Sequence, residues 1–288
     1  IKDRLVHYFV LSIYINLFIV TVFNFINWDL KFIDTEEIKR FKGYLNILTI
    51  LVLILPFIKK TKMNIVAYLF LIPNLWLSNC NSAILGILIA LIALSVFYIY
   101  QNIFRFKILF YALFFIALTL SSQILLNLPE NLDKESIQTQ KFIVPTFLVD
   151  VHRQYIWSFS IKKISEKPLL GYGPDTSNFI EGSQEIIGSK YTGTMPYIPS
   201  HPHNFLLEII LDTGLIGLAG FIFFIFYYNF KIFRKSDDKG KFLLILFFFY
   251  FWGSSLVNFS FWLGWWQVSY FFITSLISSF NLSKNQKT

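Results

Sequence analysis

The sequence predicts an all-α polytopic membrane protein that carries one large polar loop. Hydrophobic residues make up 55% of its 288 residues and charged residues only 15%, and phenylalanine alone occupies 35 positions. This balance is too apolar for a soluble domain of the same length. The apolar residues also gather into runs of bilayer-spanning length, which charged connections separate.

Eight segments have the length and composition of membrane-spanning helices, which need about 20 apolar residues. They cover about 5–27, 43–58, 64–80, 82–100, 108–126, 204–230, 241–257 and 262–280. The chain therefore divides into N-terminal transmembrane helices over 1–126, an extracytoplasmic catalytic loop over 127–203 and C-terminal transmembrane helices over 204–288. Because Ile1 is not an initiating methionine, we expect further helices to precede it.

The basic residues between the predicted spans set the orientation, because cytoplasmic connections carry an excess of lysine and arginine. With both chain ends in the cytoplasm, 14 positive charges fall on that side: Lys2, Arg4, Lys59, Lys60, Lys62, Arg105, Lys107, Lys231, Arg234, Lys235, Lys239, Lys241, Lys284 and Lys287. This arrangement puts the loop 127–203 outside. It also explains the net charge of +8 without a role in binding nucleic acid.

Tryptophans near the predicted span ends are typical of anchoring at the membrane interface. We expect this role, and no catalytic one, for Trp28, Trp262, Trp265 and Trp266.

The polar loop contains a predicted amphipathic helix over 149–167 that lies on the membrane. Arg153 and Trp157 are four residues apart and share one face of it. Pro168 ends the helix, and the glycines of 169–174 favour a tight turn. The stretch 182–199 is rich in Gly, Ser, Thr and Pro, which fits either a mobile flap over a binding site or an ordinary flexible loop.

The loop ends at His203, where an apolar helix begins. Asn204, Glu208 and Asp212 are spaced by four and form one polar stripe, which we expect to line a cavity open to the outer side. Gly214, Gly217 and Gly220 follow at intervals of three and predict a smooth face for a neighbouring helix.

His203 is the candidate general base, because a neutral imidazole can accept a proton from a hydroxyl. Its alternative role is to cap the helix or to bond a carbonyl. His201 completes an H-x-H pair that could hold zinc, but no third or fourth ligand is evident, so no metal or cofactor is expected. The Arg153 guanidinium matches a phosphate bidentately, although the same residue also suits the exposed face of a surface helix.

Missing motifs narrow the chemistry. The sequence has no glycine-rich loop ending in Gly-Lys-Ser/Thr, no G-x-S-x-G elbow and no outer D-x-D pair. A transfer reaction on the outer side of the membrane would need a donor that is already activated there. A lipid-linked pyrophosphate fits, since its leaving group needs a cation such as Arg153 and its acceptor needs a base such as His203.

Two motifs resemble those of the O-antigen ligase and polymerase superfamily. The first runs from Arg153-Gln154-Tyr155-Ile156-Trp157 to Lys167-Pro168-Leu169-Leu170-Gly171-Tyr172-Gly173, like the family's Arg-x-x-x-Trp helix and Pro-Leu-x-Gly-x-Gly turn. The second is His201-Pro202-His203-Asn204 with Glu208, Asp212, Gly214 and Gly217, similar to the family's His-Asn helix ending in Glu-x-Gly-x-x-Gly.

The resemblance implies a metal-independent glycosyltransferase with a GT-C-like fold in the bacterial inner membrane. Its donor would be an undecaprenyl-pyrophosphate-linked glycan, and its acceptor a glycan or lipid A-core. His203 would activate the acceptor hydroxyl and Arg153 would engage the pyrophosphate. Asn204, Glu208, Asp212, Trp157 and His201 would contact substrate.

One position departs from the family pattern. Asn81 stands where members of the family often carry Arg or Lys at the outer start of an inner helix. Its amide can donate hydrogen bonds to a phosphate but supplies no charge. Asn81 is therefore a further candidate for substrate binding.

Two alternatives remain open at the level of sequence. A ligase would transfer a finished glycan to lipid A-core or protein, whereas a polymerase would extend another lipid-linked repeat unit, which is the more frequent case in this family. A polytopic transporter or permease without glycosyl transfer is the rival from another class. Transporters place ionisable residues near the bilayer midplane. The predicted spans 82–100, 108–126 and 241–257 contain no charged residue apart from Lys241 at the start of the last.

Overall fold

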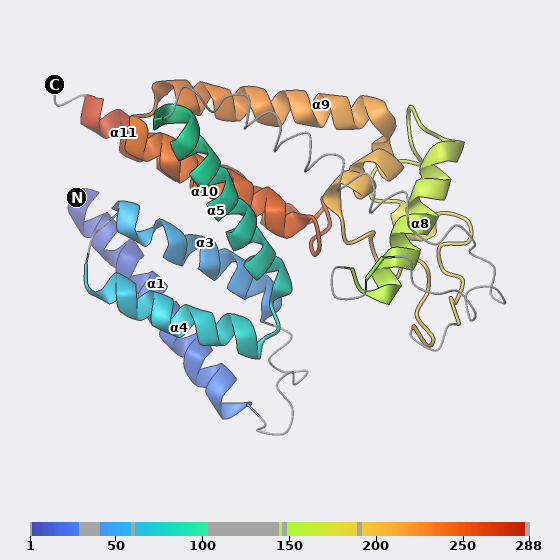
Figure 1. Cartoon of the computed structure of the whole chain (residues 1–288), viewed down its shortest axis with the longest axis horizontal. Helices are drawn as coiled ribbons and strands as arrows, with labels where there is room; N and C mark the ends of the chain where they lie inside the picture. The colour runs from blue at the N-terminus through green and yellow to red at the C-terminus, as the bar shows by residue number, and fades with distance from the viewer. Residues whose placement is uncertain are drawn as a thin grey trace. The chain divides into compact units, whose positions relative to one another are not determined.

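The computed structural model describes residues 2–28, 41–58, 61–102, 144–145, 149–188 and 192–285 (Figure 1). These ranges form the α-helices α1 (Lys2–Ile26), α3 (Lys42–Ile58), α4 (Met63–Leu77), α5 (Asn81–Asn102), α8 (Val151–Glu166), α9 (Phe205–Lys235), α10 (Asp238–Ser255) and α11 (Gly264–Asn285), with a short 3-10 helix η2 (Ser177–Phe179). Over the same ranges there is no strand, apart from one isolated bridge between Ile186 and Pro196. The mostly helical architecture is confirmed.

Among the described residues, three helices are long and apolar enough to cross a membrane: Arg4–Ile26, Asn81–Gln101 and Phe205–Lys235. Helices α3 and α4 are apolar but shorter, with 17 and 15 residues. Helices α10 and α11 occupy the last two predicted spans, and the predicted span 108–126 lies outside the described residues. The chain is consistent with a membrane protein, while the count of eight spans and a GT-C-like fold stay predictions.

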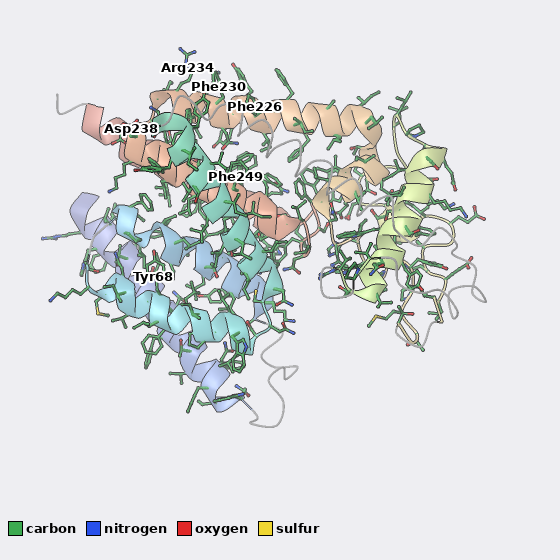
Figure 2. All side chains as sticks on the ribbon, viewed as in Figure 1. Tyr68, Phe226, Phe230, Arg234, Asp238 and Phe249 are labelled. Atoms are coloured by element: carbon green, nitrogen blue, oxygen red, sulfur yellow. The ribbon has the colours of Figure 1, made fainter. Side chains whose placement is uncertain are left out.

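The aromatic surface of α9 suits a lipid environment. Phe226 and Phe230 project from the helix (Figure 2), and 69% and 47% of their surfaces are exposed. Phe223 is 72% exposed on the same helix. Large apolar side chains exposed in this way along a helix of spanning length are typical of contact with lipid.

The contacts divide the chain into two compact units. The first comprises 1–95, 231–254 and 268–288, and the second 96–230 and 255–267. In the first unit, α1, α3 and α4 pack against one another. Amide side chains link them: Asn24 Nδ2 donates to Asn74 Oδ1 at 2.7 Å, and Asn74 Nδ2 donates to Thr21 Oγ1 at 2.7 Å. Such interhelical hydrogen bonds hold helices together where burial from water contributes little.

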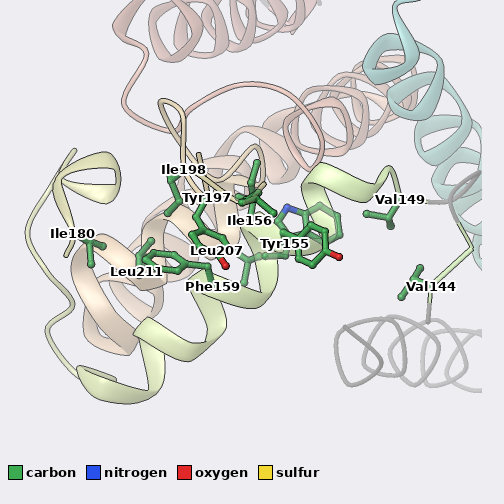
Figure 3. Close-up of a cluster of buried hydrophobic side chains, with 12 residues drawn as sticks. Val144, Val149, Tyr155, Ile156, Phe159, Ile180, Tyr197, Ile198, Leu207 and Leu211 are labelled. Carbon is green, nitrogen blue, oxygen red and sulfur yellow. The ribbon is translucent and has the colours of Figure 1, made fainter. Parts of the chain in front are cut away.

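The second unit has its own core around α8 (Figure 3). Ile156 and Phe159 of α8 meet Ile198 and Leu211, and Tyr197 stacks on Phe159 with ring centroids 5.2 Å apart. The predicted amphipathic helix is therefore confirmed as a helix. Its placement with the apolar face on the membrane is wrong, because protein side chains cover that face.

The segment predicted to be either a mobile flap or a flexible loop is folded into this core. Tyr197 N donates to Glu185 O at 3.1 Å, and Ile198 N donates to Ser183 O at 2.9 Å. The side chains of Ile187 and Ile198 are fully buried. Its described residues therefore pair with one another and pack under α8, and neither sequence interpretation anticipated this.

The turn after α8 fits into a break in α9. Gly214 has φ 67° and ψ −172°, so the helix is interrupted there. Tyr172 N donates to Leu211 O at 3.0 Å, and Leu215 N donates to Pro168 O at 2.8 Å, so the turn supplies partners to the interrupted backbone. The prediction of a smooth glycine face for another helix is wrong at Gly214, where a turn takes that place.

Candidate functional site

The N-terminus of α8 presents two basic side chains. Asp150 caps the helix by accepting a hydrogen bond from Arg153 N at 3.0 Å, and its carboxylate also pairs with Arg153 Nε at 3.3 Å. The side chains of Arg153 and Asp150 are 32% and 53% exposed. His152 precedes Arg153, and its Nε2 lies 3.0 Å from Pro196 O. Since a carbonyl only accepts, His152 donates from Nε2.

Trp157 fixes the position of the H-P-H segment. Its side chain is buried one turn after Arg153, and its Nε1 donates to Pro202 O at 3.0 Å. Arg153 and Trp157 lie one turn apart on α8, so the hydrogen bond of Trp157 to Pro202 places the N-terminal end of α8 next to the two histidines. The hydrogen bond from the indole holds the backbone between His201 and His203 in place.

His203 is held in an unusual backbone conformation. Its φ is 55°, in the left-handed region that is costly for a residue other than glycine, by about 1–3 kcal/mol. His203 N donates to His201 Nδ1 at 3.1 Å, and the two rings lie 4.2 Å apart. His201 therefore supports the strained conformation, which aims the His203 ring.

The hydrogen bond of the His203 ring determines which nitrogen is available for proton transfer. His203 Nδ1 lies 3.1 Å from Asn258 O in the connection between α10 and α11. The carbonyl cannot donate, so Nδ1 carries the proton, and in the neutral ring Nε2 holds the free lone pair. This is the tautomer that a general base acting through Nε2 requires.

Burial and neighbouring charge keep both histidines neutral. Burial lowers the pKa of His203, and the Arg153 charge acts in the same direction, against the raising effect of Asn258 O. Burial, His203 and Arg153 together lower the pKa of His201 to about 3. Arg153 is thus close enough to act on both rings. The site combines a neutral base with a nearby permanent cation.

We expect His201 to make stability depend on pH. An unfolded histidine titrates near pH 6.5, whereas the folded pKa of His201 is about 3. Between these values the unfolded chain binds more protons, so stability falls as the pH falls. His201→Asn keeps an acceptor for His203 N without a titrating ring. Melting temperatures measured from about pH 7 to about pH 4 are expected to fall more steeply in the wild type than in this variant. Parallel curves would contradict the assignment.

Glu208 and Asp212 secure the loops around the histidines. Glu208 accepts from Ser260 Oγ and Phe261 N, both at 2.6 Å. Asp212 Oδ2 accepts from Trp262 Nε1 at 2.6 Å and from Asp175 N at 3.1 Å. Both carboxyls are almost completely buried. At Glu208 and Asp212 the predicted stripe therefore faces protein and not an open cavity. These two carboxyls hold the connection whose Asn258 carbonyl orients His203.

Truncating Asp212 is expected to destabilise the fold. Asp212→Ala would leave the part-buried N–H groups of Trp262 and Asp175 and the buried Ser177 hydroxyl without their acceptor, at a cost of about 2–4 kcal/mol. Asp212→Asn keeps one oxygen for the two N–H groups, and the Ser177 hydroxyl can turn to accept from the amide. Thermal unfolding in detergent should therefore separate the two variants. Equal losses would contradict the hydrogen-bond assignment.

The other predicted site residues have different roles or positions. Asn204 caps α9, because its Oδ1 accepts from Leu206 N at 3.0 Å and Leu207 N at 3.2 Å. Asn81 is the first residue of α5, is exposed and belongs to the first compact unit, whereas His203 and Arg153 belong to the second.

Two of the four tryptophans expected at the membrane interface donate hydrogen bonds to other side chains of the protein. Trp266 is 1% exposed and donates to Ser255 Oγ at 2.8 Å. Trp262 donates to Asp212. For Trp266 the prediction of interfacial anchoring is wrong, because its side chain is buried in the protein. For the half-buried Trp262 it stays a prediction.

Sequence reasoning missed His152 and Asn258. His152 stands directly before Arg153 in the first turn of α8, and this adjacency was a usable signal. Asn258 contributes a backbone carbonyl, which leaves no trace in the sequence. Among the residues that the structure describes, no three His, Cys, Asp or Glu side chains gather as metal ligands.

Comparison with known proteins connects this site to a family. The family model described as O-antigen ligase matches residues 66–222. Relatives named "Putative polysaccharide ligase" occur in Rickettsia conorii, Rickettsia prowazekii and Rickettsia typhi, with 32%, 30% and 29% identity over 140, 150 and 172 residues. These matches cover 48%, 52% and 59% of this chain but only 32%, 35% and 42% of the relatives. No solved structure matches at a significant level.

The chain is helical and apolar, with two histidines before the long apolar helix α9 and an arginine in the first turn of α8. These features define a membrane protein with a candidate acid–base site. The family model covers more than half of the sequence and includes both motifs of that site. The chain belongs to the O-antigen ligase family, and its class is that of membrane proteins in polysaccharide biosynthesis.

Proposed function

We propose that this protein transfers a glycan from an undecaprenyl-pyrophosphate donor to an acceptor hydroxyl on the outer face of the bacterial inner membrane. The observation that carries the proposal is the half-buried His203 ring, which is bonded through Nδ1 to Asn258 O and whose pKa is lowered by burial. Family membership supports the substrate class.

The proposed reaction is an inverting displacement. His203 Nε2 removes the proton from the acceptor hydroxyl, and the oxygen attacks the anomeric carbon of the donor. A new glycosidic bond forms as the bond to the pyrophosphate oxygen breaks, and the leaving pyrophosphate takes the electron pair. The proton stays on the imidazole until it passes to solvent, and no cofactor is needed for this balance.

Arg153 is the proposed partner of the leaving group. Its planar guanidinium matches phosphate geometry and can donate two parallel hydrogen bonds. Its ion pair with Asp150 is partly exposed, and such pairs contribute only about 0–1 kcal/mol. A pyrophosphate can therefore compete successfully with Asp150 for the guanidinium.

We assign positioning roles to Trp157, Glu208 and Asp212, in place of the substrate contacts expected from sequence. Protein partners occupy their polar atoms: Pro202 O for the indole, and Ser260, Phe261 and Trp262 among the donors to the carboxyls. Substrate contact is retained as a proposal for His201, Asn204 and Asn81.

We propose that the protein acts as a ligase, which transfers a finished glycan to an acceptor such as lipid A-core. The relatives carry the name polysaccharide ligase, which favours transfer of a finished glycan over the polymerase suggested by family frequency. Product length distinguishes the two, because a ladder of products would indicate polymerisation.

The donor role is tested by varying Arg153 and its partner. Arg153→Ala is expected to raise the KM for the donor by about 10–100-fold, the equivalent of a lost charge-assisted hydrogen bond. Asp150→Asn preserves the helix cap and frees the guanidinium, so it should lower the donor KM by up to about fivefold. Initial rates of lipid pyrophosphate release measure both. An unchanged KM in Arg153→Ala would remove Arg153 from the mechanism.

A further inference from the structure

The turn that follows α8 exposes two large apolar side chains. Leu169 is 61% exposed and Leu170 is 73% exposed. Because the apolar face of α8 already packs in the protein core, these two leucines form a separate apolar surface. We define it as the leucine turn, residues 168–171.

Hydrogen bonds attach the leucine turn to α9. Leu215 N donates to Pro168 O at 2.8 Å, and Ile216 N donates to Leu169 O at 3.3 Å. Leu215 and Ile216 are themselves 49% and 60% exposed. The exposed apolar surface thus continues from the turn onto the first residues of α9 after its break.

The length of α9 places this junction at the boundary of the hydrocarbon. From Leu215 to the basic residue Lys235 the helix rises 20 residues, roughly 30 Å, which is the thickness of the hydrocarbon core of a bilayer. The side chains of Phe223 and Phe226 between these ends are exposed, as lipid-facing residues are. With Lys235 at one surface, Leu215 and the turn bonded to it lie near the other.

Charge near the turn suits the headgroup layer. Lys162 and Lys167 are exposed at the C-terminal end of α8, immediately before the turn. Lysines beside inserted apolar residues are typical of membrane-interface segments, since the ammonium stays among phosphates while the apolar groups enter the lipid.

We propose that the leucine turn inserts Leu169 and Leu170 into the phospholipid leaflet on the loop side of the membrane. The insertion anchors the C-terminal end of α8, while the N-terminal end of the same helix carries Arg153. The membrane thereby fixes how far α8, which carries Arg153, lies from the bilayer surface. This anchor does not depend on the proposed reaction.

Site-specific fluorescence tests the insertion. The chain has one cysteine, Cys80, which is buried, so Leu170→Cys in a Cys80→Ser background gives a single labelling site. Glu181→Cys in the same background is the matched control, an exposed polar position in the same compact unit. Each variant carries an environment-sensitive dye in nanodiscs of phosphatidylethanolamine and phosphatidylglycerol without any polyprenyl lipid. Quenching is compared between lipids with nitroxide-labelled chains and aqueous iodide.

We expect the dye at position 170 to emit at shorter wavelength and to lose most of its fluorescence to the lipid nitroxide, while the dye at 181 responds to iodide. Quenching at 170 by iodide would overturn the proposal. Protection from both quenchers would also overturn it, by showing a protein contact. Lipid quenching that required added polyprenyl phosphate would assign the turn to the donor's tail and not to the bilayer.

Discussion

Replacing His203 with alanine is expected to reduce the rate of glycan transfer by about 10²–10⁴-fold, the contribution of a positioned general base. The reason is specific to the ring: Nδ1 is bonded to Asn258 O, so Nε2 alone is free to take the acceptor's proton. The measurement is the initial rate of transfer by purified protein in nanodiscs at saturating donor. His7→Ala is the control, because His7 is exposed on α1 in the other compact unit.

A second variant separates catalysis from positioning. His203→Asn places an amide that can still donate to Asn258 O, but it has no atom equivalent to Nε2. We expect it to be as inactive as the alanine variant while unfolding at a temperature close to that of the wild type. Substantial activity in His203→Asn would show that the ring only supports the backbone.

Replacing Gly214 with alanine is expected to cost about 2–6 kcal/mol of folding free energy. Gly214 has φ 67° and ψ −172°, a region that is almost exclusive to glycine. A Cβ there would also overlap the Leu169 carbonyl, which is backbone and has little room to move. Gly171 faces the same constraint from the opposite side, where a Cβ would lie 2.5 Å from the Asp212 carbonyl carbon.

Gly220→Ala is the matched control on the same helix, since a Cβ at Gly220 has no neighbour within 4 Å among the described residues. Thermal unfolding monitored in nanodiscs should show a large loss for Gly214→Ala and nearly none for Gly220→Ala. Equal stability of the two variants would contradict the interlocked turn.

Local patterns were sufficient to predict several elements. The apolar runs predicted α1, α3, α5 and α9 to within a few residues at most ends, because helix length and hydrophobicity are local properties. Pro168 ended α8 as expected. The placement of His203 at the loop end, beside Arg153, also followed from spacing and family motifs.

Long-range partners could not be predicted in this way. Glu208 and Asp212 share a helix face, which the sequence does show. Their structural role depends on the hydrogen bonds that they accept from Ser260 and Trp262, about 50 residues further along the chain. The glycine at 214 fits both a helix-packing face and a helix break, and only its backbone angles decide between them. The tautomer of His203 is set by the backbone carbonyl of Asn258, and no pattern of side chains in the sequence can predict a backbone partner.

The most direct test of glycan transfer uses the intact protein in lipid with a polyprenyl-pyrophosphate oligosaccharide and a range of acceptor glycans. Release of the lipid pyrophosphate and the length of the glycan product are followed together, for the wild type and for His203→Ala. We predict donor consumption by the wild type, its loss in the variant, and a single product of finished length. Absence of donor consumption by the wild type with every acceptor would contradict glycosyl transfer and would direct attention to transport.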